Sequence, residues 1–341
     1  MVPRIAPRAG RPRVKVAQVE YTNTMNKRRL TQQQARRVQA HRRADQAATP
    51  SEPDDQIGTV IARYGKQALV EGAAGERTLC HLRAHLDAPV AGDAVFWSPS
   101  AGAGVINVIL ERSNTVQRPD AQGRLRPVAA NIDLMLIVFA PEPAPHPNLL
   151  DRYLVAAETS GIDAALVLNK SDLLIDGSLQ DLLRGYEALG YPTLVTRRDM
   201  ADDSALRALI GEQSLVLVGQ SGVGKSSLIQ RLLPDRDIRI GALSEAADKG
   251  RHTTTTAELF HLPGGGRLID SPGVREFGLH HIAAEDVAAG FREFAPFLGR
   301  CQFRDCRHQS EPNCALQAAR DRGEISAGRF ASYEQIITSL N

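Results

Sequence analysis

A glycine-rich run that ends in Lys225 and Ser226 is the most specific chemical pattern in the sequence. Residues 219–226 match the spacing G-x-x-x-x-G-K-[ST], after a short apolar run and before a helical one. Glycines at this spacing let backbone N–H groups turn inward around a phosphate, and a helix N-terminus adds its dipole. The flanking pattern therefore favours a nucleotide phosphate site over a chance glycine-rich turn. The expected binding residues are Gly219, Gln220, Ser221, Gly222, Val223, Gly224, Lys225, Ser226 and Ser227.

Two side chains of this loop have distinct expected tasks. Lys225 is expected to reach the β and γ phosphates and to assist catalysis, and the Ser226 hydroxyl to ligate Mg²⁺.

The segment Asn169-Lys170-Ser171-Asp172 predicts which base is bound. Guanine presents N1–H and its exocyclic amine as adjacent donors, and a single carboxylate can accept both, whereas adenine lacks that pair. We expect Asp172 to make these bonds, Asn169 to face the O6/N7 edge of the base, and the Lys170 stem to pack along the ring. Combined with the phosphate loop, the segment favours GTP over ATP.

The order of these motifs indicates a circular permutation. In ordinary GTPases the phosphate loop comes first, whereas here N-K-S-D precedes it by about 50 residues. Asp270-Ser-Pro-Gly273 follows, with Asp270 expected to hold Mg²⁺ through water and the Gly273 N–H to contact the γ-phosphate. Residues 250–256 fit switch I, in which one of four threonines, assigned as Thr254, would ligate Mg²⁺. Residues 195–198 stand where a base-contacting segment is expected, and no single residue there is assigned.

The sequence predicts slow hydrolysis by the isolated chain. Many GTPases place a glutamine directly after D-x-x-G to orient the attacking water, and here that position is Val274. His252, beside the threonine run, is the internal candidate for positioning water. The alternative is that His252 contacts only RNA or solvent. Because the second switch leads into the C-terminal residues, loss of the γ-phosphate could also move that part of the chain.

Cys301, Cys306, His308 and Cys314 place three thiols and one imidazole within 14 residues. This set suits one tetrahedral structural Zn²⁺. The alternatives are reduced free cysteines or disulfides, and a disulfide would leave His308 unexplained. Cys80 stands apart and is expected to be a small buried residue.

The elements around these motifs predict a multidomain α/β protein. Five short strand patterns between residues 57 and 110 indicate a small barrel, an OB-fold or an SH3-like barrel. From residue 131 strands and helices alternate, as in a doubly wound sheet, and the last stretch is helical around the cysteines. The expected domains are a basic arm (1–55), an OB-fold barrel (56–115), a circularly permuted P-loop GTPase domain with its linker (116–282) and a zinc-binding helical domain (283–341).

Charge is distributed unevenly along the 341 residues. Residues 1–47 hold 12 Lys and Arg against two acidic residues, although the whole chain carries a net charge of only +2. Such an arm suits a polyanion such as RNA. The alternatives are a solvated disordered tail and an organellar transit peptide. The sequence has no apolar run long enough to span a membrane and only four cysteines, so we expect a cytoplasmic protein without a membrane partner. No pattern indicates association between copies, and we expect a monomer.

Taken together, these motifs resemble one known family. The barrel, the permuted order, G-Q-S-G-V-G-K-S-S, N-K-S-D, G-R-H-T-T-T, D-S-P-G-V-R-E-F and the C-x4-C-x-H-x5-C spacing resemble the bacterial small-ribosomal-subunit-dependent GTPases (RsgA/YjeQ) over residues 55–341. The resemblance implies GTP hydrolysis stimulated by the 30S subunit and a role in its late maturation. It also implies an OB-fold that contacts 16S rRNA and a C-terminal zinc domain. The basic arm lies outside the pattern.

Two other classes of function fit the motifs less well. A P-loop kinase or ATPase is disfavoured by N-K-S-D and by the lack of a recognisable phosphoryl-acceptor site. An RNA-binding module that uses nucleotide only for stability is disfavoured by the set of Mg²⁺ ligands, Ser226, Asp270 and a switch threonine.

Overall fold

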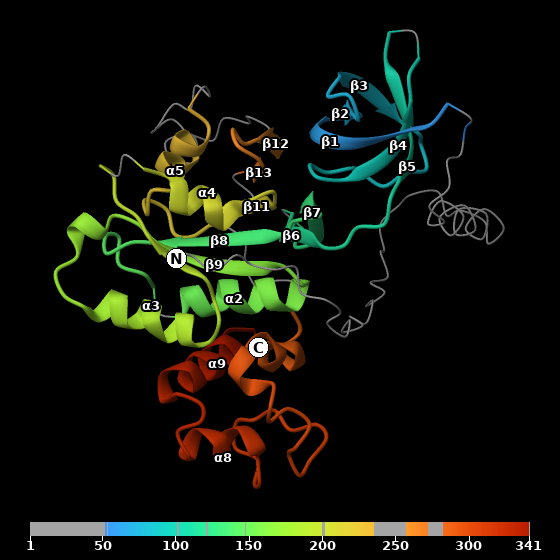
Figure 1. Ribbon diagram of the computed structural model, residues 1–341. Helices are drawn as coiled ribbons and strands as arrows, with labels where there is room; N and C mark the ends of the chain where they lie inside the picture. The colour runs from blue at the N-terminus through green and yellow to red at the C-terminus, as the bar shows by residue number, and fades with distance from the viewer. Residues whose placement is uncertain are drawn as a thin grey trace.

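The computed structural model describes residues 52, 54–100, 102–120, 122–146, 148–199, 202–234, 257–271 and 282–340. These residues form a barrel, a central α/β sheet with helices and a C-terminal helical module, in that order along the chain (Figure 1). Most of the basic arm, the switch I segment 250–256 and Gly273 lie outside the described residues. Among the helices that are described, none has the length and apolar character of a membrane span.

The first body is a closed five-stranded barrel. Its strands follow the order β1-β2-β3-β5-β4, and β4 pairs back with β1. The pairing of β3 with β5 is parallel, which separates this barrel from an all-antiparallel meander and matches the predicted OB-fold. Cys80 is fully buried in the barrel core, as expected. The strands are β1 (Gln56–Tyr64), β2 (Gln67–Gly72), β3 (Arg77–Leu82), β4 (Ala94–Ser98) and β5 (Gly104–Ile109).

A two-stranded hairpin connects the barrel to the central sheet. It consists of β6 (Thr115–Pro119) and β7 (Leu125–Ala130), a stretch expected only as linker. The turn is organised by Asp120, whose carboxylate accepts hydrogen bonds from the backbone N–H groups of Gln122 and Arg124. Prolines in both strands and a register shift weakened the strand pattern in the sequence.

The central sheet runs β10-β9-β8-β11-β13-β12. Neighbouring strands from β10 to β13 are parallel, and β12 is antiparallel to β13. These strands are β8 (Leu134–Phe139), β9 (Asp163–Leu168), β10 (Thr193–Val195), β11 (Ser214–Val218), β12 (Glu258–His261) and β13 (Arg267–Asp270). Parallel strands of this kind need cover on both faces, which explains their continuous apolar sequences.

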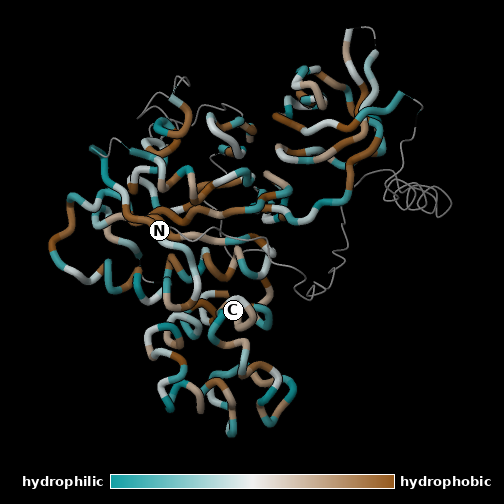
Figure 2. Tube along the Cα trace, in the orientation of Figure 1, coloured by the Kyte–Doolittle hydropathy of each residue, from teal (hydrophilic) through white to brown (hydrophobic). Residues whose placement is uncertain are grey.

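Helices supply that cover, and strand β8 shows both faces. Met135, Ile137 and Phe139 pack into the core beneath α2 and α3, and the alternate residues pack into the core beneath α4 and α5. Figure 2 shows the apolar strands at the centre of the sheet and hydrophilic residues on the outer helices. The helices are α2 (Leu149–Ser160), α3 (Ser178–Ala188), α4 (Ser204–Ile210) and α5 (Lys225–Leu232).

The C-terminal module packs against α2. Phe291, Phe294 and Tyr333 are almost fully buried, and they belong to the same apolar core as Leu154 and Val155 of α2. The module contains two 3-10 segments and two helices: η2 (Ala284–Gly290), η3 (Arg292–Phe294), α8 (Ala315–Asp321) and α9 (Ala327–Leu340).

The barrel joins the central sheet at the edge strand β12. Strand β1 pairs antiparallel with β12 through Ala62 and Glu258, so that barrel and sheet form one continuous set of eleven paired strands. His261 Nε2 on β12 also lies 2.5 Å from Glu71 Oε1 on β2. Strand β12, which follows the predicted switch I segment in the sequence, therefore contacts the barrel directly.

Candidate nucleotide site and metal centre

The predicted nucleotide motifs meet at one edge of the central sheet. Asn169 directly follows β9, Gly219 directly follows β11, and Asp270 is the last residue of β13. Strands β9, β8, β11 and β13 are parallel neighbours in that order, so their carboxyl ends lie on the same edge. This is the edge at which open α/β sheets bind ligands.

Three glycines of the phosphate loop, at positions 219, 222 and 224, have a positive φ, and at two of them a side chain would also overlap other atoms. Gly219 has φ 139° and Gly224 has φ 99°, both in the region that disfavours other residues. A Cβ at position 219 would overlap the Val138 carbonyl oxygen, and one at position 224 would overlap Asn169 Nδ2. The glycines therefore let the loop lie directly against β8 and the base motif.

Lys225 and Ser226 begin helix α5, with Gly224 as its N-cap. The Lys225 ammonium donates hydrogen bonds to the Gly219 and Gln220 carbonyl oxygens, at 2.6 and 2.7 Å, and the residue is buried. The charge is thereby held within the curve of the loop. Ser226 is half-buried at the helix start, where free N–H groups favour an anion.

Asn169 ties the base motif to the phosphate loop. Its Nδ2 donates to the Val223 carbonyl oxygen at 2.9 Å, and its Oδ1 accepts from Thr196 Oγ1 at 2.9 Å. Asn169 is 5% exposed and Thr196 is 2% exposed. The sequence pointed to residues 195–198 without assigning one of them. In the structure Thr196 is the residue of this segment whose side chain bonds to Asn169. Its only sequence signal is a hydroxyl residue directly after strand β10.

The rest of the base motif is arranged around this buried amide. Lys170 adopts φ 56°, and its Nζ donates to the Glu142 carbonyl oxygen at 2.8 Å, which spans the motif to the loop after β8. The Ser171 N–H donates to the Thr196 carbonyl oxygen at 3.1 Å. Asp172 is exposed in the short helix η1 (Ser171–Leu173), three residues after the buried Asn169.

The structure places only part of the predicted switch apparatus. Asp270 is half-buried at the end of β13, next to the buried Ser271. His252, Thr254 and Gly273 lie outside the described residues. Their predicted roles stay predictions.

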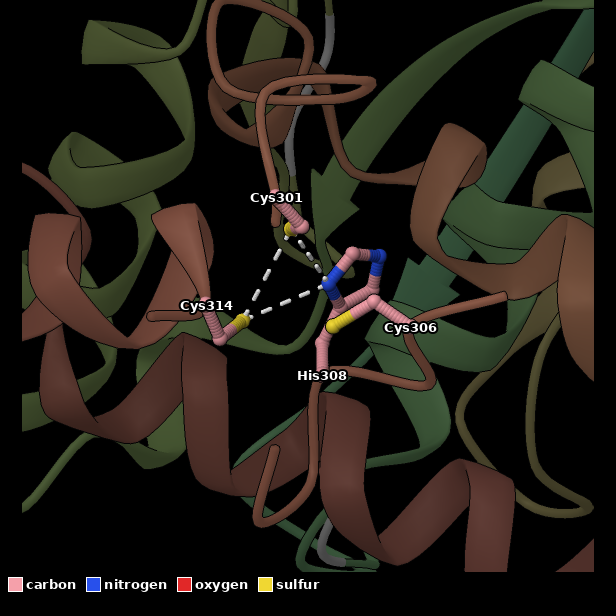
Figure 3. Close-up of side chains that lie close together, drawn as sticks. All are labelled: Cys301, Cys306, His308 and Cys314. Atoms are coloured by element: carbon pink, nitrogen blue, oxygen red, sulfur yellow. Dashed lines mark hydrogen bonds between the residues drawn. The ribbon is translucent and has the colours of Figure 1, made fainter. Parts of the chain in front are cut away.

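The four predicted metal ligands converge on one point (Figure 3). His308 Nδ1 lies 3.4 Å from Cys301 Sγ and 3.4 Å from Cys314 Sγ, and the two sulfurs are 3.9 Å apart. All four potential ligand atoms, including Cys306 Sγ, lie within 4.8 Å of one another. A tetrahedron with metal–sulfur bonds of about 2.3 Å has sulfur–sulfur edges of about 3.8 Å. The cluster therefore has the donors and spacing to hold a tetrahedral metal ion.

Local backbone structure presents these ligands. Cys314 is the N-cap of α8, and Cys301 Sγ accepts the Ala315 N–H at 3.4 Å. Glu311 accepts hydrogen bonds from the N–H groups of Arg307, Gln309 and Ser310, which fixes the loop around His308. Burial raises the pKa of Cys306 to about 12 and raises that of Cys314, and burial lowers the pKa of His308. A bound cation would replace the thiol protons.

The fold and the nucleotide edge together define a class of protein. The base motif follows β9 and the phosphate loop follows β11, two parallel strands that lie on either side of β8, and the chain reaches the base motif first. A P-loop sheet with this order of motifs is a circularly permuted GTPase domain, here joined to an OB-fold barrel and a module with a cysteine-histidine cluster.

Comparison with known proteins identifies the family. The model of the RsgA GTPase domain matches residues 109–280. A protein from Chromohalobacter salexigens is 54% identical over 295 residues, which cover 84% of this chain and 86% of that relative. A protein from Azotobacter vinelandii is 51% identical over 338 residues, or 93% of this chain and 98% of that relative. Both are named small ribosomal subunit biogenesis GTPase RsgA. The chain therefore belongs to the RsgA GTPase family and is a GTP-hydrolysing enzyme.

Solved structures agree with this assignment. The crystal structure of YjeQ from Thermotoga maritima superposes with a TM-score of 0.70 at 30% identity, covering 84% of this chain and 98% of that one. The structure of YloQ, described as a circularly permuted GTPase, gives a TM-score of 0.66 at 26% identity, covering 86% of this chain and 98% of that one. The predicted fold class is confirmed.

Proposed function

We propose that this GTPase acts in late maturation of the small ribosomal subunit, binding 16S rRNA in its GTP state and leaving after the 30S subunit has stimulated hydrolysis. The observation that carries the proposal is the buried Asn169 amide, which joins a guanine-reading segment to a phosphate loop at one sheet edge. The names of the relatives supply the process, small ribosomal subunit biogenesis.

The proposed division of labour follows the positions of the side chains. Asp172 is exposed at the edge, where its carboxylate can accept the two adjacent donors of guanine. Lys225 lies within the curve of the loop, where a phosphate would take over hydrogen bonds that its ammonium now gives to loop carbonyls. Ser226 is the second residue of α5, which follows β11, and Asp270 is the last residue of the neighbouring strand β13. We assign both side chains to Mg²⁺, together with Thr254.

Hydrolysis requires a group that orients the attacking water. Val274, at the position directly after D-x-x-G, has no polar side chain to do so. We assign this task to His252, and we assign the γ-phosphate contact to the Gly273 N–H. The isolated protein should therefore turn over slowly, at about 10⁻⁴ to 10⁻² s⁻¹, until the subunit completes the site. Replacing His252 with alanine should abolish stimulated turnover and leave GTP affinity within a few-fold; unchanged stimulated turnover would remove His252 from the mechanism.

The remaining assignments concern ions and partners. We propose that the ion held by Cys301, Cys306, His308 and Cys314 is structural Zn²⁺, because three thiolates and one imidazole in a closed set suit that ion. We also propose that the basic arm 1–47 contributes to RNA binding, that the protein acts as a monomer, and that it works in the cytoplasm. The arm carries the excess positive charge that a polyphosphate partner would attract.

The deciding experiment measures phosphate release from GTP with and without purified 30S subunits. We expect the subunits to raise the rate at least tenfold, and Lys225→Ala to remove the response. ATP in place of GTP should give no stimulated release. Equal rates with and without subunits would overturn the proposed function, and equal use of ATP would favour an ATPase.

A further inference from the structure

Asp270, which we assign to Mg²⁺, lies on a row of paired residues that begins in the barrel. Its register partner on β12 is Glu258, and the partner of Glu258 on β1 is Ala62. Neighbouring strands lie about 4.8 Å apart, so two strand spacings separate the barrel strand from the backbone of Asp270. The end of β13 is therefore kept in register by a strand of the barrel.

A turn of the barrel also lies directly against the residue before Asp270. A Cβ built on Gly92 would lie 2.9 Å from Ile269 Cδ1, and it would overlap the Ala130 carbonyl oxygen. Ile269 is 1% exposed in the core shared by the barrel and the sheet. The contact between this turn and β13 therefore leaves no room for a side chain at position 92.

Buried polar contacts fix this turn. Asp93 is fully buried, and its carboxylate accepts two hydrogen bonds from Arg112, at 2.6 and 2.7 Å. The Gly92 N–H donates to the Val60 carbonyl oxygen at 2.9 Å, and the Gly92 carbonyl oxygen accepts from Asn131 Nδ2 at 2.9 Å. A turn whose buried groups are paired in this way keeps its place against β13.

We infer that the barrel positions Asp270 for Mg²⁺: the turn at Gly92 and the paired row from Ala62 hold the end of β13 where its carboxylate can serve the ion. Gly92 is a positioning residue, since it acts through Ile269 and not by contact with the ion. This role rests on the proposed assignment of Asp270 to Mg²⁺. The assignment fits the donors present, because a carboxylate and the Ser226 hydroxyl are the oxygen ligands that Mg²⁺ prefers.

The test compares two glycines of the barrel in the full-length protein. Gly92 and Gly102 both have φ 90°, so alanine meets similar backbone strain at each. Within the described part of the chain, no atom lies within 4 Å of a Cβ built on Gly102. Gly102→Ala is therefore the matched control for Gly92→Ala, which adds the collision with β13 and β7.

Equilibrium binding of GDP is measured for the wild type, both glycine variants and Asp270→Ala. Each protein is assayed with saturating Mg²⁺ and in buffer freed of Mg²⁺ before the protein is added, so that the cysteine cluster keeps its ion. The readout is the Mg²⁺ factor, the ratio of the two GDP affinities. A loss of general structure would weaken GDP binding in both buffers and leave this ratio unchanged.

We expect a Mg²⁺ factor of at least about tenfold in the wild type and in Gly102→Ala, and of less than about twofold in Asp270→Ala. In Gly92→Ala the factor should fall below about threefold, while GDP affinity without Mg²⁺ stays within about twofold of the wild type. If Gly92→Ala does not fold, Asn131→Asp loosens the same turn by removing the amide donor to Gly92, and its Mg²⁺ factor should fall in the same direction.

A Mg²⁺ factor as large in Gly92→Ala as in Gly102→Ala would overturn the inference and leave the assignment of Asp270 intact. A full Mg²⁺ factor in Asp270→Ala would overturn both. Failure of the proposed function gives a different result, since the wild type would then bind ADP as well as it binds GDP, whatever its Mg²⁺ factor.

Discussion

The central sheet is attached to its two neighbours in very different ways. The C-terminal module joins it through an apolar core and buried charges, whereas the barrel meets β12 through one register pair, a half-exposed ion pair, and Ile61 and Ala91, which belong to the same apolar core. Both lie close in the sequence to predicted switch segments. The two junctions therefore differ chiefly in their charged groups, which are buried at the C-terminal module and half-exposed at the barrel.

The C-terminal junction contains a buried network of charged and aromatic groups. Arg329 on α9 pairs with Asp151 on α2 and, at 2.6 Å, with Glu293, and Tyr186 donates to the same Asp151 at 2.5 Å. Arg292 pairs with Glu158 at 2.5 Å. Separating the module would expose this network together with the aromatic core. The structure thus disfavours the idea that γ-phosphate loss moves the whole module.

At the barrel junction the ion pair is half-exposed, beside the buried Ile61. His261 is 51% exposed in its pair with Glu71, and Glu71 also pairs with Arg77 at 2.9 Å. Half-exposed pairs of this kind contribute less than about 1 kcal/mol. Breaking this ion pair alone would therefore cost little, whereas separating the barrel from β12 would also expose Ile61.

Metal removal should give the largest effect, and it should stay within the outer part of the C-terminal module. Chelation deletes the only cross-links proposed for residues 301–314, so proteolysis should cut there at least tenfold faster. With Mg²⁺ kept in excess over the chelator, GDP affinity should change less than twofold, because the aromatic core on α2 remains. Cys306→Ser should behave as the chelated protein, and the buried Cys80→Ser variant should keep its metal. Loss of GDP binding on chelation would contradict a separate, rigid core.

Arg329→Met should give the next largest effect. The change leaves Asp151 and Glu293 buried without a cationic partner, a loss of about 3–5 kcal/mol in the free energy of unfolding. Arg320→Met is the matched control, because Arg320 stacks on Phe330 but pairs only with the exposed Asp321. Its cost should be below about 1 kcal/mol. Urea denaturation measures both, and similar values would show that the network does not hold the module.

Glu71→Gln should give the smallest effect and a pH signature. Burial raises the pKa of Glu71, but hydrogen bonds from Arg77 and His261 outweigh this and bring it below the ordinary value. A carboxyl with a lowered pKa stabilises the fold above its unfolded pKa, and that contribution disappears as the pH falls through the folded pKa. The difference between wild type and Glu71→Gln should be under about 1 kcal/mol at pH 7 and disappear as the pH falls through the lowered pKa of Glu71. A difference that grows in acid would be inconsistent with this pairing.

The sequence was most informative where chemistry or periodicity is local. The phosphate loop, the base segment and the cysteine cluster were each predicted from spacing, and the alternation of strands and helices from residue 131 was predicted from periodicity. Their convergence on one sheet edge follows from the parallel strand order. The roles and the domain boundaries predicted for these residues remain to be tested.

What the sequence did not predict depends on contacts between distant segments. The hairpin β6–β7 was hidden because proline and arginine replace the usual alternation. Thr196 was missed because its significance comes from Asn169, 27 residues earlier in the chain. The pairing of β1 with β12 joins residues almost 200 positions apart, and no local pattern encodes it.

The most direct test of a guanine site at this edge changes the base-reading carboxylate alone. Equilibrium binding of GDP and XDP is measured for the wild type and for Asp172→Asn, with Asp176→Asn, an exposed carboxylate four residues later, as the control. An amide can donate to the extra oxygen of xanthine, so Asp172→Asn should reverse the preference from GDP to XDP by at least tenfold. The control should bind as the wild type does. An Asp172→Asn protein that still prefers GDP would contradict the account.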